Sequence, residues 1–151
     1  MIKNIFELPV YTEVCERINK LDANSQPKWG KMDVAQMLAH CSVTYEMLYT
    51  DKFEKPKGFK KFLLKKFIKP VVVGEKPYKK NSRTAPAFLV VDKKDFEKER
   101  EQLLRYLAKA NDEGENAFEG RESHSFGVLT KREWNNMFYK HIDHHLNQFG
   151  A

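Results

Sequence analysis

Three of the five histidines in this chain of 151 residues lie within five positions, at His141, His144 and His145. Side chains four residues apart on an α-helix project from the same face one turn apart, so His141 and His145 can direct two imidazoles at one metal ion. Imidazole is a ligand that suits zinc, nickel, copper and iron. A third ligand must come from another element, and His40 is the leading candidate. Three histidines would leave coordination positions open for water or substrate, as catalytic zinc sites do.

The same spacing also occurs where no metal binds. Two histidines four residues apart can simply occupy an exposed helix face, and a histidine such as His40 can be a hydrogen-bonded side chain at the edge of a core. A zincin-type metalloprotease is excluded, because its motif needs a glutamate directly after the first histidine and Ile142 stands there. Asp143 lies about 200° around the helix from His141 and should face away from a shared metal. No substitute acid or base is evident.

Three neighbouring residues are candidates for orienting the ligand rings. Gln148 lies three residues after His145 and can hydrogen-bond to its ring. Thr44 lies one turn after His40 and can serve in the same way. His144 projects about 100° away from His145 around the helix axis, so it either helps to orient the site or caps a neighbouring helix.

The composition is that of one soluble, helix-rich globular domain, expected to span residues 1–151, with 32% charged and 41% hydrophobic residues. A chain of this length buries a core without disulfide or metal staples, so a metal would be functional rather than structural. Cys15 and Cys41 lie far apart with no CxxC spacing, and no charged region followed by an apolar run opens the sequence. This predicts reduced thiols and a cytoplasmic protein. No transmembrane segment is expected, because no stretch approaches the roughly 18 to 20 apolar residues that cross a bilayer.

Most of the net charge of +6 lies in the segment from Lys52 to Lys80. Within it, Gly58 to Lys69 is predicted to form a short helix with apolar residues on one side and lysines on the other. An alternative function follows, in which segment 58–69 docks on anionic lipid or nucleic acid in a binding module without enzymatic activity. Lysines also commonly solvate the outer face of a packed helix. The metal hypothesis is therefore favoured, and nucleic acid is not expected as a partner.

Four long helices are predicted to position the histidines, over about 9–21, 33–50, 92–111 and 130–149. Asp33 and Thr130 can cap the second and fourth, because Gln36 and Glu133 follow three residues later, as in a capping box. The third helix is predicted to open at Asp92.

Two connections complete the expected architecture. The one from Asp51 to Val91 is too long for a structureless loop, and besides the basic helix it holds the stretch 87–91, predicted to be extended. Residues 120–129 are predicted to form a polar loop. His141 and His145 continue the apolar stripe of the fourth helix and should face the interior. The pattern predicts an all-α four-helix bundle, with a long crossover between helices 2 and 3 that contains the short basic helix, and such bundles build metal sites between facing helices.

Four segments, taken in order, carry a family resemblance: Trp29-Gly30-Lys31-Met32, residues 35–41 ending in His40-Cys41, residues 126–130 with Glu133-Trp134, and residues 141–150. They resemble the DinB/YfiT-like superfamily of metalloenzymes, and more closely a branch known only as a domain of unknown function. The resemblance implies an up-down-down-up four-helix bundle. It also implies that His40, His141 and His145 are the ligands of a divalent metal, zinc or nickel.

The resemblance further implies a class of chemistry. Characterised relatives include S-transferases that use bacillithiol and a mycothiol-dependent isomerase, in which the metal is thought to activate a low-molecular-weight thiol. The expected function is thus a metal-dependent enzyme acting on a small molecule, a thiol-dependent S-transferase or a hydrolase, and a homodimer is one expected assembly. A family member that keeps the ligands without an activity is also compatible with the sequence.

Overall fold

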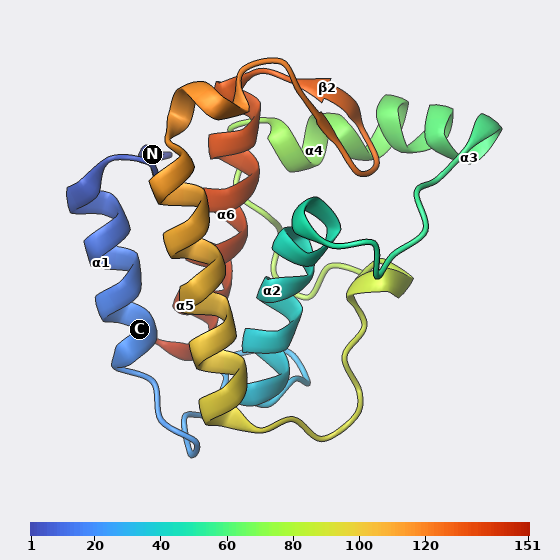
Figure 1. Cartoon of the computed structure of the whole chain (residues 1–151). Coiled ribbons are helices and arrows are strands. Elements are labelled where there is room, and N and C mark those ends of the chain that lie inside the picture. Colours follow the sequence, from blue (N-terminus) through green and yellow to red (C-terminus); the bar gives the residue numbers. More distant parts are fainter.

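Four long helices form the body of the molecule: α1 (Leu8–Asn19), α2 (Val34–Tyr49), α5 (Phe96–Glu113) and α6 (Lys131–Phe149). The computed structural model describes residues 1–151. Both α1 and α2 pack against α5 and α6. The colours of Figure 1 show that α2 and α5 run in one direction and α1 and α6 in the other. The predicted helical elements are therefore present, and their shared interior holds the main core.

The helix ends follow from local hydrogen bonds. Asp33 accepts a bond from the Gln36 amide at 2.8 Å and Gln36 returns one to the Asp33 amide at 3.0 Å, which confirms the predicted capping box of α2. Thr130 and Glu133 form the corresponding box at the start of α6. That helix ends at Gly150, whose φ of 77° is the left-handed conformation that glycine adopts without strain.

Two predictions for the chain between α2 and α5 were wrong. Helix α5 begins at Phe96 rather than Asp92, because Asp95 is the residue whose side chain accepts a hydrogen bond from the Lys98 amide, at 2.9 Å. Residues 87–91 are not all extended, since Pro86–Phe88 forms a 3-10 turn (η2). A proline fixes φ near the helical value, which favours a turn at this point.

A small sheet corrects the all-α prediction. Strands β1 (Arg121–Ser123) and β2 (Gly127–Leu129) pair antiparallel where a polar loop was expected, after a 3-10 turn (η3) at Glu115–Phe118. The Ser123 hydroxyl accepts from the Phe126 amide at 3.0 Å and donates to the Gly127 carbonyl at 2.8 Å, which closes the turn. The fold is thus mostly helical with one hairpin. Three-residue strands are too short to show an alternating pattern in the sequence.

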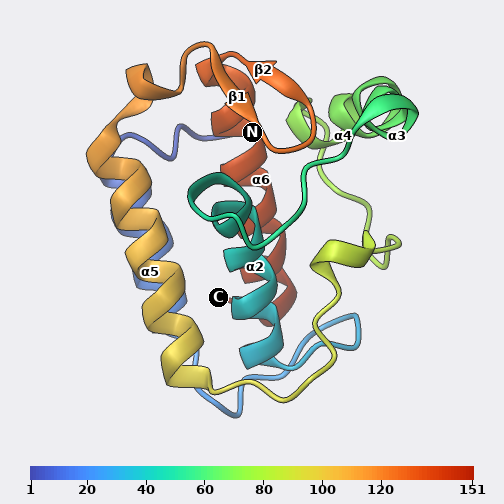
Figure 2. The ribbon, with the colours of Figure 1, turned by 45° about the vertical axis from the view of Figure 1, so that its right-hand side comes forward.

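The basic segment forms one continuous helical run, here called the arm: α3 (Gly58–Leu63), a π-helical turn (η1, Leu64–Ile68) and α4 (Lys69–Val73). The predicted helix is present and extends four residues further than expected. In Figures 1 and 2 the arm projects away from the long helices, beside the hairpin. None of the helices combines the length and the apolar composition that a membrane-spanning segment requires.

Two side chains of α6 fasten the end of the arm to the body. The Lys140 ammonium donates to the carbonyls of Val71 at 2.7 Å and Gly74 at 2.6 Å, and the Asn136 amide donates to the carbonyl of Val73 at 2.9 Å. These are carbonyls at a helix C-terminus, where a cation and hydrogen-bond donors are favourable. Burial lowers the pKa of Lys140.

Candidate metal centre

The structure brings together the three histidines that the sequence singled out. His40 projects from α2 and His141 and His145 from α6, and one ring nitrogen from each lies within 4.8 Å of the other two. His40 and His145 are buried and His141 is half-buried. The cluster therefore lies between two facing helices, at positions that the apolar stripes of both helices turn inward.

The main-chain carbonyl of Phe88 sets the protonation of the His40 ring. Nδ1 of His40 lies 2.8 Å from that oxygen. A carbonyl oxygen only accepts, so Nδ1 carries the proton and donates it. In a neutral ring Nε2 is then left with its lone pair and is the atom available to a metal. This contact could not be expected from the sequence, because Phe88 is 48 residues away in the crossover.

A chain of two hydrogen bonds sets the ring of His145. The Gln148 side-chain nitrogen donates to the Trp29 carbonyl at 2.6 Å, which leaves the amide oxygen of Gln148 facing Nδ1 of His145 at 2.7 Å. That oxygen is an acceptor, so Nδ1 carries the proton and Nε2 is left free. The predicted hydrogen bond between Gln148 and the His145 ring is present in the structure. The Trp29 carbonyl in turn holds Gln148.

His141 is held by the Thr44 hydroxyl, which can either donate or accept a hydrogen bond. The Thr44 hydroxyl lies 3.1 Å from Nδ1 of His141, and Nε2 of His141 lies 2.9 Å from Nε2 of His40. Because Nε2 of His40 carries no proton, His141 must donate to it here and accept from Thr44 at Nδ1. A hydroxyl is both donor and acceptor, so Thr44 can equally accept from Nδ1 when Nε2 of His141 turns to a metal.

The loop before α2 must approach the end of α6 closely for this arrangement to exist. The Lys28 amide donates to the Gln148 carbonyl at 2.7 Å, and a Cβ at Gly30 would lie 2.5 Å from the Gln148 side-chain nitrogen. The φ of Gly30 is 87°, a conformation that side chains rarely adopt. The Trp29-Gly30 pair is thereby explained as a support of the histidine site.

Burial keeps all three rings neutral. It lowers the pKa of His40, lowers that of His141 well below the ordinary value of 6.5, and lowers that of His145 to about 3. The neighbouring imidazoles add to the effect, since each disfavours a positive charge on the others. Neutral imidazole is the form that binds a metal, so protons compete weakly for this site.

Aromatic and basic groups lie next to the cluster, around His144. His144 is half-buried, makes no hydrogen bond, and lies edge-on to the rings of His145, Trp29 and Tyr78, with centroids 5.1, 5.7 and 5.8 Å away. The Lys80 ammonium lies over the Trp29 ring, 4.3 Å from its centroid. His144 neither binds in the cluster nor caps a helix. It stands at the edge of the cluster, against the rings of Trp29 and Tyr78.

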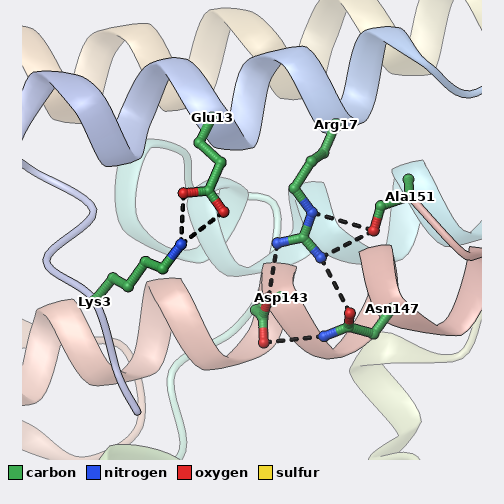
Figure 3. A network of polar contacts seen from close by, with 6 residues as sticks. All are labelled: Lys3, Glu13, Arg17, Asp143, Asn147 and Ala151. Atoms are coloured by element: carbon green, nitrogen blue, oxygen red, sulfur yellow. Dashed lines mark hydrogen bonds and ion pairs between the residues drawn. The ribbon is translucent and has the colours of Figure 1, made fainter.

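No carboxylate joins the cluster. Asp143 was expected to face away from the histidines, and the Arg17 guanidinium of α1 binds it at 2.7 Å, as Figure 3 shows. The same guanidinium donates to the side-chain oxygen of Asn147 at 3.3 Å and to the Ala151 carbonyl at 3.1 and 3.2 Å. This network ties α1 to α6 on the side opposite the histidines. Asp143 thus has a structural partner and is not part of the site.

The remaining histidine and the buried thiol lie outside the site. His124 sits in the hairpin, where its Nε2 lies 3.2 Å from the Phe53 carbonyl. The Cys41 thiol is buried against the sulfur of Met37 at 3.7 Å, and burial raises its pKa, as for an inert packing residue. A surface hollow near the start of α6, lined by Asn4 and Arg132 among others, is not lined by any histidine.

The chain matches a protein family over nearly its whole length. A family model described as "Protein of unknown function (DUF1569)" matches residues 4–151. That range includes the three histidines and every group that hydrogen-bonds to their rings. No curated protein and no solved structure matches the chain.

Proposed function

Because the chain belongs to the DUF1569 family, whose description assigns no activity, we propose its function from the site: a divalent-metal-dependent enzyme in which His40, His141 and His145 hold the ion. The single observation that carries this proposal is that a hydrogen-bond partner orients each of the three rings. Each Nδ1 has its own partner, namely the Phe88 carbonyl, the Thr44 hydroxyl and the Gln148 amide oxygen. Such outer partners orient ligand histidines in metal sites, and a packing cluster does not require them.

The metal we propose is zinc or nickel. The three donors are neutral nitrogens of borderline softness, and neither a thiolate nor a carboxylate stands among them. This set is poorly suited to calcium or magnesium, which take oxygen ligands. The short separation of 2.9 Å between Nε2 of His40 and Nε2 of His141 requires only a small opening for a shared ion, because zinc–nitrogen bonds of about 2.1 Å place ligand atoms roughly 3 Å or more apart.

We further propose that the substrate is a small molecule carrying a thiol, which makes the protein a thiol-dependent transferase in preference to a hydrolase. Held by His40, His141 and His145, all neutral ligands, a divalent ion would supply the positive charge that keeps a thiol in its thiolate form. Hydrolases of the zincin type add a carboxylate base for the attacking water, and here Asp143, the nearest acidic residue in sequence, is bound to Arg17 on the other side of the helix. The residues of the chain therefore need only bind the ion, exclude water and position the electrophile.

The arrangement of the helices supports kinship with the DinB/YfiT-like superfamily. Helices α2 and α5 run together and against α1 and α6, and the long crossover joins α2 to α5. We propose on this basis that the four long helices form an up-down-down-up bundle of that type. Its metal site would then lie where the second and fourth long helices face each other, which is where the histidines meet.

Elemental analysis of protein purified without an affinity tag tests the proposal. We expect about one equivalent of zinc or nickel per chain, and its loss from the double variant His141→Ala, His145→Ala. His124→Ala is the matched control, because it removes an imidazole outside the cluster and should leave the metal in place. Wild-type protein that is folded yet takes up neither metal after incubation with each would overturn the proposal.

A further inference from the structure

The apolar side of the arm faces solvent instead of the protein. Residues 59, 63, 67 and 71 recur every four positions, with Phe62 beside Leu63, and so form one stripe along a helix. The exposed fractions are 74% for Phe59, 54% for Phe62, 36% for Leu63, 59% for Phe67 and 58% for Val71. The residues turned toward the body include Leu64, Val72 and Val73. A surface helix normally buries its apolar stripe, so this one has an outward face without a partner.

Positive charge borders the same stripe. The chain from Lys55 to Lys69 contains seven lysines and no acidic residue. Two of them bind the body, since Lys61 lies 3.4 Å from Glu122 of the hairpin and Lys69 lies 2.8 Å from Glu133 of α6.

Other lysines of the arm remain directed at solvent. Lys60 and Lys66 are exposed and have no ionic partner. The Lys66 ammonium lies 5.9 Å from the centroid of the Phe62 ring and 5.4 Å from that of the Phe67 ring. Aromatic and cationic groups thus share one surface.

From this surface we propose that the arm docks on an anionic lipid membrane, with Phe59, Phe62 and Phe67 entering the boundary between headgroups and acyl chains. The lysines that flank the stripe lie at the depth of the phosphate groups. Amphipathic helices of this composition lie in the plane of the interface, and each lysine close to an anionic surface adds to binding. Since the arm projects from the long helices, it can reach a flat surface without rearrangement of the body (Figure 2).

Charge favours an anionic membrane over a second copy of the chain as the partner of the stripe. Two arms packed stripe against stripe would bring their lysines together, in a chain whose net charge is already +6. An anionic membrane neutralises those lysines while it covers the stripe. Nucleic acid would meet the lysines but would leave Leu63 and Val71 in water, because phosphates offer nothing to aliphatic side chains.

The arm is held at the angle that presents the stripe. Lys140 and Asn136 bind its last carbonyls, and Lys61 ties its first part to the hairpin through Glu122. Because Lys140 directly precedes His141, the docking surface and the histidine site are supported by adjacent residues of α6. A membrane-bound protein would thereby keep its histidine site at a fixed height above the lipid.

Co-sedimentation of the full chain with vesicles tests the proposal. The protein should bind vesicles of equimolar phosphatidylglycerol and phosphatidylcholine at low salt, and should not bind vesicles of phosphatidylcholine alone. Replacing two exposed aromatics, in the variant Phe59→Ser, Phe67→Ser, should weaken binding by roughly tenfold or more. Lys60→Ala, Lys66→Ala should weaken it by about tenfold. The matched control Lys93→Ala, Lys98→Ala removes the same charge near the start of α5 and should bind as the wild type does.

Other results would overturn the proposal. Vesicle binding that survives the loss of both phenylalanines would show unspecific attraction of a basic protein. The protein could instead fail to bind vesicles and form a concentration-dependent dimer that the variant Phe59→Ser, Phe67→Ser abolishes. That result would assign the stripe to contact with a second copy of the chain. Retention of a DNA duplex with equal affinity in that variant, again without vesicle binding, would assign the lysines to nucleic acid. The metal content of the same variant should equal that of the wild type, so the two proposals fail separately.

Discussion

The main-chain carbonyl of Trp29 sets the ring of His145 through a single intervening amide, that of Gln148. The Trp29 carbonyl accepts a hydrogen bond from the side-chain nitrogen of Gln148 at 2.6 Å. The side-chain oxygen of Gln148 must therefore face Nδ1 of His145, which lies 2.7 Å away. A loop between α1 and α2 therefore decides which nitrogen of a buried histidine in α6 is free to bind a metal.

Gln148→Leu removes the acceptor of His145 Nδ1 and should lower zinc affinity by roughly 10- to 100-fold, the usual cost of losing an outer partner of a ligand. Gln148→Glu retains an acceptor for the ring but places a second acceptor against the Trp29 carbonyl. It should hold zinc more tightly than Gln148→Leu while unfolding at a lower denaturant concentration than the wild type. Zinc competition titrations and denaturant unfolding measure the two effects, and equal zinc affinity in all three proteins would contradict the link.

Gly30→Ala should disturb the same hydrogen bonds of Gln148, here through the loop that holds Trp29. The new Cβ would lie 2.5 Å from the side-chain nitrogen of Gln148, at a φ of 87° that alanine rarely adopts. We expect a loss of about 1–2 kcal/mol in the free energy of unfolding, and weaker zinc binding as Gln148 is displaced.

A second glycine serves as the control for this prediction. Gly120 has a φ of 73°, and its Cβ would meet nothing within 4 Å. Gly120→Ala therefore imposes similar backbone strain without the contact, and it should lower stability while leaving zinc affinity unchanged. Parallel loss of zinc affinity in both variants would show that strain alone is responsible.

The stability of the metal-free protein should fall as the pH falls below about 6.5. The pKa values of His40, His141 and His145 are lowered in the fold, to about 3 for His145, so the unfolded chain binds more protons than the native one in this range. Each histidine that stays neutral costs up to about 1.4 kcal/mol of unfolding free energy per pH unit below 6.5. Denaturant unfolding between pH 7 and pH 4 measures the slope. In the variant His141→Ala, His145→Ala the unfolding free energy should fall less steeply as the pH is lowered. An unchanged slope would show that these histidines do not have lowered pKa values in the fold.

Much of the helical framework could be predicted from the sequence because it depends on local signals. Asp33 and Thr130 carry their partners three residues later, and the stripe of α6 turns His141 and His145 inward. The start of α5 was misplaced because Asp92 and Asp95 offer equivalent caps in sequence, and only the packing of Phe96 into the core distinguishes them.

The histidine cluster was predictable in its members and only partly in its supports. Gln148 lies one turn from His145 on the same helix, where periodicity places it. Thr44 lies one turn from His40 on α2, but its hydroxyl contacts His141 of α6, a pairing that periodicity alone does not give. The carbonyls of Phe88 and Trp29 could not be found in this way, because every residue has a carbonyl and long-range loop packing decides which one reaches a ring. Whether the apolar side of segment 58–69 faces the body or solvent stayed open for a related reason. Periodicity gives an apolar stripe but not the direction in which it faces.

Nitrogen-15 NMR of the imidazole rings would show directly whether His40, His141 and His145 bind one zinc ion through their Nε2 atoms. In metal-free protein His40 and His145 should appear as neutral rings protonated at Nδ1, as the Phe88 carbonyl and the Gln148 oxygen require. On addition of one equivalent of zinc, Nε2 of His40, His141 and His145 should shift together to metal-bound values, with Nδ1 of His141 now protonated. The Nε2 signals of His124 and His144 should stay in place. Zinc that leaves the three Nε2 signals unmoved, or that shifts His124 or His144 in their stead, would contradict the account.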